Sequence, residues 1–128
     1  METYTTHDIT VNVQSQYEHE HSNIKEKRYV FSYLIEIINE GSATVQLLRR
    51  HWIILDSNGI KREVQGDGVV GEQPTLRPGE SYRYTSWCPF NSEIGMMKGY
   101  FSMKRLVDQH TLRVTVPAFT MCARPKLN

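Results

Sequence analysis

The sequence predicts an all-β chain that folds as an antiparallel β-sandwich of immunoglobulin or fibronectin type III-like architecture, with about seven strands. Val, Ile and Thr together number 29, whereas Ala numbers three, and β-branched residues favour strands over helices. Apolar and polar residues alternate along short segments, and turn signals separate these segments at intervals of about ten residues. No segment shows a helical period. We therefore expect a single domain over residues 1–128, an ordinary length for one core.

The first two predicted strands flank a polar loop. Residues 8–14 carry apolar side chains at alternate positions, which is the pattern of a half-buried strand. Residues 15–27 are polar and charged, so we expect a loop there. Residues 28–38 are largely apolar on both faces, which is typical of a central strand that is covered on both sides.

The middle of the chain predicts a β-hairpin. Residues 45–55 follow a turn signal at 39–42 and form the third strand. The pair Asn58-Gly59 is the strongest short hairpin signal, because both central residues of such a turn must tolerate positive φ. Residues 60–65 should therefore return antiparallel to the third strand.

The C-terminal half supplies the remaining strands. A glycine-rich loop at 66–74 and the turn Pro78-Gly79 precede three strands, which we place at residues 81–88, 97–107 and 110–121. Pro117 has no N–H to donate to a neighbouring strand, so the end of the last strand should lie at a sheet edge or form a bulge. An exposed edge strand can pair with a second copy of itself, so a homodimer is one expectation.

Composition and charge exclude several classes of protein. Fifteen Lys and Arg residues against 14 Asp and Glu residues leave a net charge of +1, which gives no whole-chain field for binding nucleic acid. The longest apolar-rich stretch, residues 29–38, is far shorter than the roughly 18 residues of a spanning helix, so no membrane insertion is expected. Met1 is followed by no signal-like segment, which indicates a cytoplasmic protein. Cys88 and Cys122 should then be reduced and buried.

Residues 66–71 satisfy the pattern G-x-G-x-x-G, the fingerprint of dinucleotide-binding loops. That fingerprint requires a helix directly after the glycines, and Pro74, Pro78 and Gly79 exclude one here. Two interpretations remain. Successive backbone N–H groups could form an anion-binding nest, with Lys61, Arg62 or Arg77 nearby, or the glycines could simply let the loop bend across the end of a sandwich.

The segment 17–21 contains two histidines that could bind a metal ion. In an extended chain, His19 and His21 would point to the same side. Two ligands do not complete a site, so a third ligand would have to come from His7 or from a second chain. The alternative is a solvated loop.

The sequence shows no clear pattern of catalytic residues. No nucleophile motif such as G-x-S-x-G is present, and Cys88 has no evident base. The carboxylates around the glycine-rich loop show nothing that distinguishes them from surface charge; they are Glu63, Asp67, Glu72 and Glu80. The aromatic pair around Arg83 fits sheet packing better than base stacking. We therefore do not expect an enzyme.

Several longer motifs together resemble the ApaG family. They are Val45-Gln46-Leu47-Leu48-Arg49-Arg50-His51-Trp52, Val64-Gln65-Gly66-Asp67-Gly68-Val69-Val70-Gly71-Glu72-Gln73-Pro74, Pro78-Gly79-Glu80, Tyr84-Thr85-Ser86, and Gly95, Met96, Gly99 and Tyr100. They cover nearly the entire chain in order, and the second motif is far more specific than the glycine fingerprint within it. Two positions depart from the family pattern: Trp87 replaces a usual Gly, and Ser92-Glu93 replaces Thr-Pro.

The resemblance implies a fibronectin type III-like sandwich, in agreement with the strand pattern. Bacterial ApaG proteins, also called CorD, are associated with cobalt resistance and magnesium efflux and have no established enzymatic reaction. Eukaryotic relatives attach the domain to F-box and polymerase-delta-interacting proteins, which implies a protein-binding module. We therefore expect no cofactor, and a divalent cation is the alternative.

These observations together predict a non-enzymatic binding domain of 1–128 that acts in divalent-cation homeostasis through a protein partner. The candidate binding residues are Gly66, Asp67, Gly68, Gly71, Glu72, Gln73, Arg77 and Trp87, with Trp87 as a candidate aromatic anchor. The alternative is a small-ligand protein that holds pyrophosphate or a nucleotide in the glycine-rich loop, with weak hydrolase activity. The metal hypothesis rests on His19 and His21.

Overall fold

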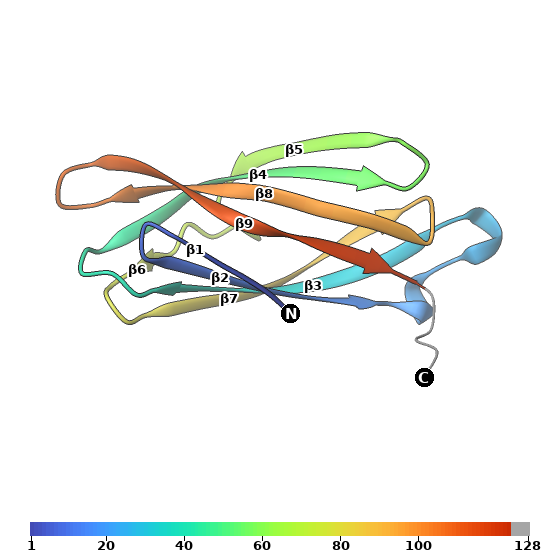
Figure 1. Ribbon diagram of the computed structural model, residues 1–128, viewed down its shortest axis with the longest axis horizontal. Helices are drawn as coiled ribbons and strands as arrows, with labels where there is room; N and C mark the ends of the chain where they lie inside the picture. Colours follow the sequence, from blue (N-terminus) through green and yellow to red (C-terminus); the bar gives the residue numbers. More distant parts are fainter. Residues whose placement is uncertain (124–128) are drawn as a thin grey trace.

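The computed structural model describes residues 1–123 and confirms the all-β sandwich (Figure 1). One antiparallel sheet has the order β1-β2-β3-β7, formed by β1 (Glu2–Thr6), β2 (Ile9–Tyr17), β3 (Tyr29–Asn39) and β7 (Ser81–Phe90). The other has the order β5-β4-β8-β9, formed by β4 (Val45–Asp56), β5 (Lys61–Asp67), β8 (Ile94–Arg105) and β9 (His110–Cys122), with the short β6 (Thr75–Leu76) beside one end of β4.

The loop predicted between the first two strands contains two short 3₁₀ turns, η1 (His19–His21) and η2 (Ile24–Glu26). No helix within residues 1–123 is long and apolar enough to cross a membrane.

Nine strands replace the predicted seven. All seven predicted strands are present, and β1 and β6 are additional. The side chains of β1 are almost entirely exposed, so its sequence lacks the apolar alternation that reveals a strand. The other added strand, β6, has only two residues. Pro117 lies where two residues of the edge strand β9 face one residue of β8, so the predicted edge or bulge is confirmed.

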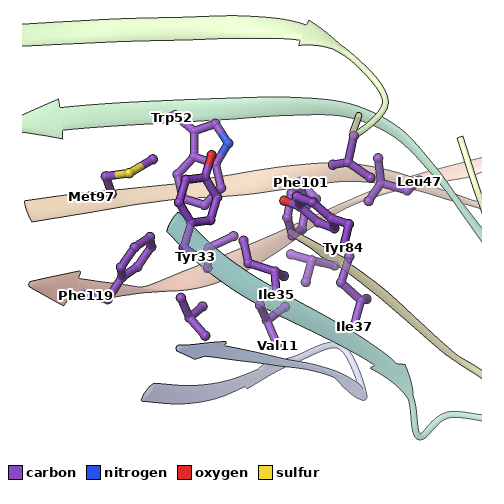
Figure 2. Packing of buried hydrophobic residues seen from close by; sticks show 14 of the residues in the cluster. Val11, Tyr33, Ile35, Ile37, Leu47, Trp52, Tyr84, Met97, Phe101 and Phe119 are labelled. Atoms are coloured by element: carbon purple, nitrogen blue, oxygen red, sulfur yellow. The ribbon is translucent and has the colours of Figure 1, made fainter. Parts of the chain in front are cut away.

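The inner faces of the two sheets form one apolar core (Figure 2). From β3, Tyr33 points at Trp52 of the opposite sheet, with ring centroids 5.7 Å apart in an edge-to-face arrangement. Trp52 also meets the edges of Phe101 and Phe119, at 6.2 and 6.0 Å. Edge-to-face pairs of this kind add to the stabilisation from burial alone.

Two predictions about burial are wrong. The outer face of β3 is covered only near its start, where Ser32 donates a 2.6 Å hydrogen bond to Glu18 of the 15–27 loop; further along, Ile38 is half-buried, because no third layer covers the strand. The two cysteines also differ. Cys88 faces the core and is buried, whereas Cys122 lies on the outer face of β9 and is exposed.

A β-bulge at Leu48 changes which side chains of β4 face the core. Leu47 pairs with Met103 and Arg49 with Ser102, so Leu48 is an extra residue in the ladder. Before the bulge Leu47 faces inward, and after it Trp52 does, although their positions differ by five, an odd number that would place them on opposite faces of a regular strand. The same shift puts Arg50 on the inner face and Arg49 on the outer one.

The two sides of the sandwich are closed to different degrees. On one side β9 packs against β1 and β2, as Figure 1 shows where these strands cross. On the other side the edge strands are β7 of one sheet and β5 of the other. The glycine-rich loop leaves β5 at this second, open side.

Candidate functional site

The glycine-rich loop ends in a tight two-residue turn. Val69 and Glu72 exchange backbone hydrogen bonds of 2.8 and 2.9 Å, and the two residues between them both have positive φ, 48° at Val70 and 80° at Gly71. This is the geometry of a type I′ turn, which favours glycine at its second central position. Val70 is a β-branched residue in a conformation that such residues rarely adopt, and its side chain is 62% exposed. The loop therefore presents an apolar side chain to solvent at a strained position.

The bulge carbonyl of Leu48 anchors this loop to β4. It accepts a 2.8 Å hydrogen bond from the N–H of Gly68 and a 2.9 Å hydrogen bond from Nε2 of Gln73. A side chain at Gly68 would collide with the carbonyl oxygen of Glu72, and the φ of +63° at this position also favours glycine. The bulge and the loop thus form one unit, although they lie in separate sequence motifs.

Two consecutive arginines of β4 hold the start of the loop from opposite faces. On the outer face, Arg49 forms a 2.6 Å ion pair with the carboxylate of Asp67. On the inner face, Nη1 of Arg50 donates hydrogen bonds to the carbonyl oxygens of Asp67 and Gly68, at 3.0 and 3.1 Å. A Cβ atom at Gly66 would lie 2.9 Å from both terminal nitrogens of Arg50, so this glycine leaves room for the guanidinium group.

A cleft of about 340 Å³ opens between the edges of the two sheets. Its lining includes three exposed apolar residues, Val64 of β5, Val70 of the loop and Trp87 from the outer face of β7, which show 38%, 62% and 49% of their surface. Trp87 also meets the edge of the His21 ring, with centroids 5.0 Å apart. Of the candidate binding residues only Trp87 lines the cleft; the glycine-rich loop contributes Val69 and Val70, which were not among the candidates.

The inner part of the cleft carries polar groups. The hydroxyl of Tyr84 is buried and has no hydrogen-bond partner among the described residues. Nη2 of Arg62 crosses from β5 to β7, where it donates a 2.7 Å hydrogen bond to the carbonyl oxygen of Pro89 and lies 3.6 Å from Sγ of Cys88. Burial raises the pKa values of Tyr84 and of the Cys88 thiol, so both groups stay protonated at neutral pH.

The candidate residues of the glycine-rich loop are together, but Arg77 is elsewhere. Gly66 and Asp67 end β5, two residues past the start of the loop expected at 66–74, and Gly68, Gly71, Glu72 and Gln73 follow in the loop that the Leu48 carbonyl anchors. Arg77 begins a turn whose Gly79 donates a hydrogen bond to the carbonyl of Asn39 at the end of β3. Asn39 lies six residues beyond Tyr33 of the cleft, about 20 Å along the strand.

The loop does not have the form of a nucleotide fingerprint. No helix follows its glycines, because β6 and the Arg77 turn come next. The N–H groups of Gly68 and Val69 donate to the carbonyl oxygens of Leu48 and Glu72, so they do not point together at a common anion position.

The metal hypothesis relied on an extended chain around the two histidines, and this premise is wrong. His19 and His21 lie in the 3₁₀ turn η1, where residues two apart do not share a side. His7 cannot complete the pair, because it precedes β2 whereas His19 follows β2, at opposite ends of a nine-residue strand. Within residues 1–123, no three His, Cys, Asp or Glu side chains are grouped so that they could hold a metal ion.

Ser92, one of the two departures from the family pattern, has a structural role. Its hydroxyl donates to the buried carboxylate of Asp56, which also accepts a 2.8 Å hydrogen bond from the N–H of Asn91. These bonds tie the β7–β8 turn to the end of β4. Ser92 therefore stabilises the end of the sandwich and does not line the cleft.

Among the lining residues of the cleft that were not candidates are Tyr33, Arg50 and Tyr84. They come from three different strands, and only the fold brings them together. One signal was present, because the inward apolar positions of β4 change from odd to even numbers between Leu47 and Trp52. Such a change marks a bulge, and it would have turned Arg50 toward the inside.

The fold and this site define a two-sheet β-sandwich domain that carries a bulge-anchored glycine-rich loop at its open side. The ApaG domain profile matches residues 19–105. Protein ApaG of Methylobacterium radiotolerans is 47% identical over 116 residues, which cover 91% of this chain and 88% of that protein. Protein ApaG of Paramagnetospirillum magneticum is 44% identical and is covered, like this chain, over its full length. The chain belongs to the ApaG family.

A solved structure agrees with this assignment. The crystal structure of the ApaA protein from Bordetella pertussis superimposes with a TM-score of 0.87 at 40% sequence identity, over 90% of this chain and 93% of that chain. The sequence-based resemblance to the ApaG family is therefore confirmed, together with the sandwich fold.

Proposed function

We propose that this protein is a non-enzymatic binding domain that contacts a protein partner through the open side of the sandwich. The observation that carries the proposal is that three residues lining the cleft, Val64, Val70 and Trp87, are both apolar and exposed. Exposed apolar side chains that gather on one surface are typical of interaction sites, and Trp is a frequent anchor residue there. The proposed process is divalent-cation handling in the cytoplasm, as the family's association with cobalt resistance and magnesium efflux suggests.

The chemistry of the cleft also supports a binding role over catalysis. Two side chains that can act as nucleophiles, Ser86 and Cys88, line the cleft, and burial raises the pKa of Cys88, which keeps the thiol unreactive at neutral pH. The residues that line the cleft include no His, Asp or Glu that could serve as a base.

The test is complementation of a bacterial strain that lacks its own ApaG protein and is grown in cobalt. The double variant Val70→Ser/Trp87→Ala should fold but restore little cobalt tolerance, because its partner surface is lost. The matched control is Val107→Ser, which removes an 85% exposed valine from the β8–β9 turn and should restore tolerance fully. Circular dichroism verifies folding. Full restoration by the double variant would contradict the proposal.

Calorimetry with cobalt alone separates this proposal from direct metal binding. We expect no saturable heat from the wild-type protein. Saturable binding that disappears in the variant His19→Ala/His21→Ala would replace the partner proposal with a metal site, completed by a ligand from a second chain.

A further inference from the structure

The charge of the cleft is entirely positive. Among residues 1–123, the charged residues that line it are Arg50 and Arg62, and no Asp or Glu lines it. Most of the remaining lining is aliphatic or aromatic, and the volume of about 340 Å³ lies within the range of small-molecule sites. A cleft with apolar walls and positive charge favours a ligand that combines an apolar body with a negative group.

Arg50 is fixed in place but keeps its charge. Its partners at the loop are the carbonyl oxygens of Asp67 and Gly68, which orient the guanidinium group without neutralising it. The carboxylate of Asp67 is bound by Arg49 on the other face of the sheet, at 2.6 Å. Nη1 of Arg50 makes both loop contacts, and a guanidinium group has five N–H donors in total. Donors therefore remain for a ligand.

Tyr84 supplies a second, independent observation. Its hydroxyl is a buried side-chain group without a hydrogen-bond partner in the described part of the chain, and the residue lines the same cleft. Buried hydroxyls in proteins are nearly always paired, with protein or with another bound molecule. The ring extends from β7 into the space between the sheets (Figure 2). Because burial raises the pKa of Tyr84 well above its ordinary value, the hydroxyl remains a hydrogen-bond donor at neutral pH.

We propose that this cleft binds a small carboxylate with an apolar body, whose carboxylate oxygens accept hydrogen bonds from the Arg50 guanidinium group and the Tyr84 hydroxyl. Arginine is the side chain best suited to a carboxylate, because its planar donors match the two oxygens. The apolar body lies against Val64, Val70 and Trp87. Arg62, held by the Pro89 carbonyl, adds positive charge toward the other end of the cleft. This ligand shares Val64, Val70 and Trp87 with the protein-partner surface proposed above, but its carboxylate contacts with Arg50 and Tyr84 do not depend on that partner.

The test is an amide NMR titration of the isotope-labelled protein with phenylacetate. Phenylacetamide is the neutral match, and inorganic pyrophosphate is an anion without an apolar body. Phenylacetate should cause saturable shifts at the amides of Val69, Val70 and residues 84–88. Phenylacetamide should bind at least about tenfold more weakly, since hydrogen bonds to a charged group are the stronger ones.

Two tyrosine variants make the assignment specific. Tyr84→Phe removes only the unpaired hydroxyl and should weaken phenylacetate binding about tenfold. Tyr82→Phe is the matched control, because Tyr82 lies on the same face of β7 but outside the cleft, and its affinity should be unchanged. Equal binding of acid and amide, or unchanged affinity in Tyr84→Phe, would overturn the proposal. Pyrophosphate shifts at residues 66–71 without phenylacetate binding would also overturn it.

A carboxylate of this kind can be a free acid or the C-terminus of a peptide. A pentapeptide that ends in phenylalanine, compared with its C-terminal amide, distinguishes these sources. Tighter binding of the free-acid peptide than of phenylacetate assigns the cleft to a peptide terminus, and the reverse order assigns it to a small acid.

Discussion

The two sheets are held together differently at the two sides of the sandwich. On the closed side, β9 brings fully buried side chains such as Val114 and Met121 against β2. Hydrogen bonds also join the sheets there, from Ser15 to the Thr120 carbonyl and from the Thr115 N–H to Thr6, both at 3.3 Å. On the open side, the long side chain of Arg62 reaches across to Pro89.

The difference shows how a sandwich of this size can keep an accessible cavity. Close contact along one pair of edges supplies the apolar burial that stabilises the fold. The other pair of edges is then free to stay apart, with an anchored loop and arginine side chains between them. The closed side thus contributes most to stability, and the open side carries the candidate functional site.

The largest expected effect tests the closed side. Met121→Ala removes a fully buried side chain from β9 and should lower the free energy of unfolding by about 3 kcal/mol. Its counterpart on the open side, Val64→Ala, removes a 38% exposed side chain and should cost about 0.5 kcal/mol. Urea denaturation measures both. Similar losses for the two variants would break the comparison.

The next effect tests the anchored loop. Gly68→Ala should cost about 2 kcal/mol, because its methyl group collides with the Glu72 carbonyl and its φ is positive. Gly71→Ala has a positive φ but open space around it, so about 1 kcal/mol is expected. Urea denaturation again gives the values. A larger loss of unfolding free energy in Gly71→Ala than in Gly68→Ala would contradict the close packing of Gly68 against the Glu72 carbonyl.

The smallest expected effect is a difference in the rate of thiol modification between the two cysteines, Cys88 at the open side and Cys122 on β9 at the closed side. An aromatic disulfide reagent should modify exposed Cys122 first and buried Cys88 at least about tenfold more slowly at pH 7. Because burial raises the pKa of Cys88, its thiolate fraction is below that of an ordinary thiol at each pH, and its rate should rise only in more alkaline solution. Single Cys→Ser variants assign the two rates. Fast modification of Cys88 at pH 7 would show that the reagent reaches its thiol, which would contradict the burial of Cys88 at the open side.

Alternation of side chains predicted much of the fold. Residues Ile9, Val11 and Val13 indicated a strand, and all three are buried on the inner face of β2. Asn58-Gly59 predicted the β4–β5 hairpin, where Gly59 has a φ of 91°. The same reasoning missed β1, because that edge strand has almost no buried side chain to alternate.

The candidate site was predictable where it is local in sequence. The motif at 64–74 identified the glycine-rich loop, and the departure from the family pattern drew attention to Trp87. The cleft residues Tyr33 and Tyr84 could not be assigned to the site in this way, because they meet Arg50 only after the strands that carry them have assembled. For the histidines, an extended segment was assumed where the chain forms a 3₁₀ turn.

The bulge at Leu48 also has a consequence for motion. The Gly68 N–H and the Gln73 side chain both bind a carbonyl that belongs to no strand ladder. Detachment of the turn at 69–72 from β4 would leave every pairing of β4 with β8 intact, but it would break these hydrogen bonds and expose Val69, which is fully buried in the core. Because Val70 belongs to the turn and Tyr84 to β7, such an opening would widen the cleft without unfolding the sandwich.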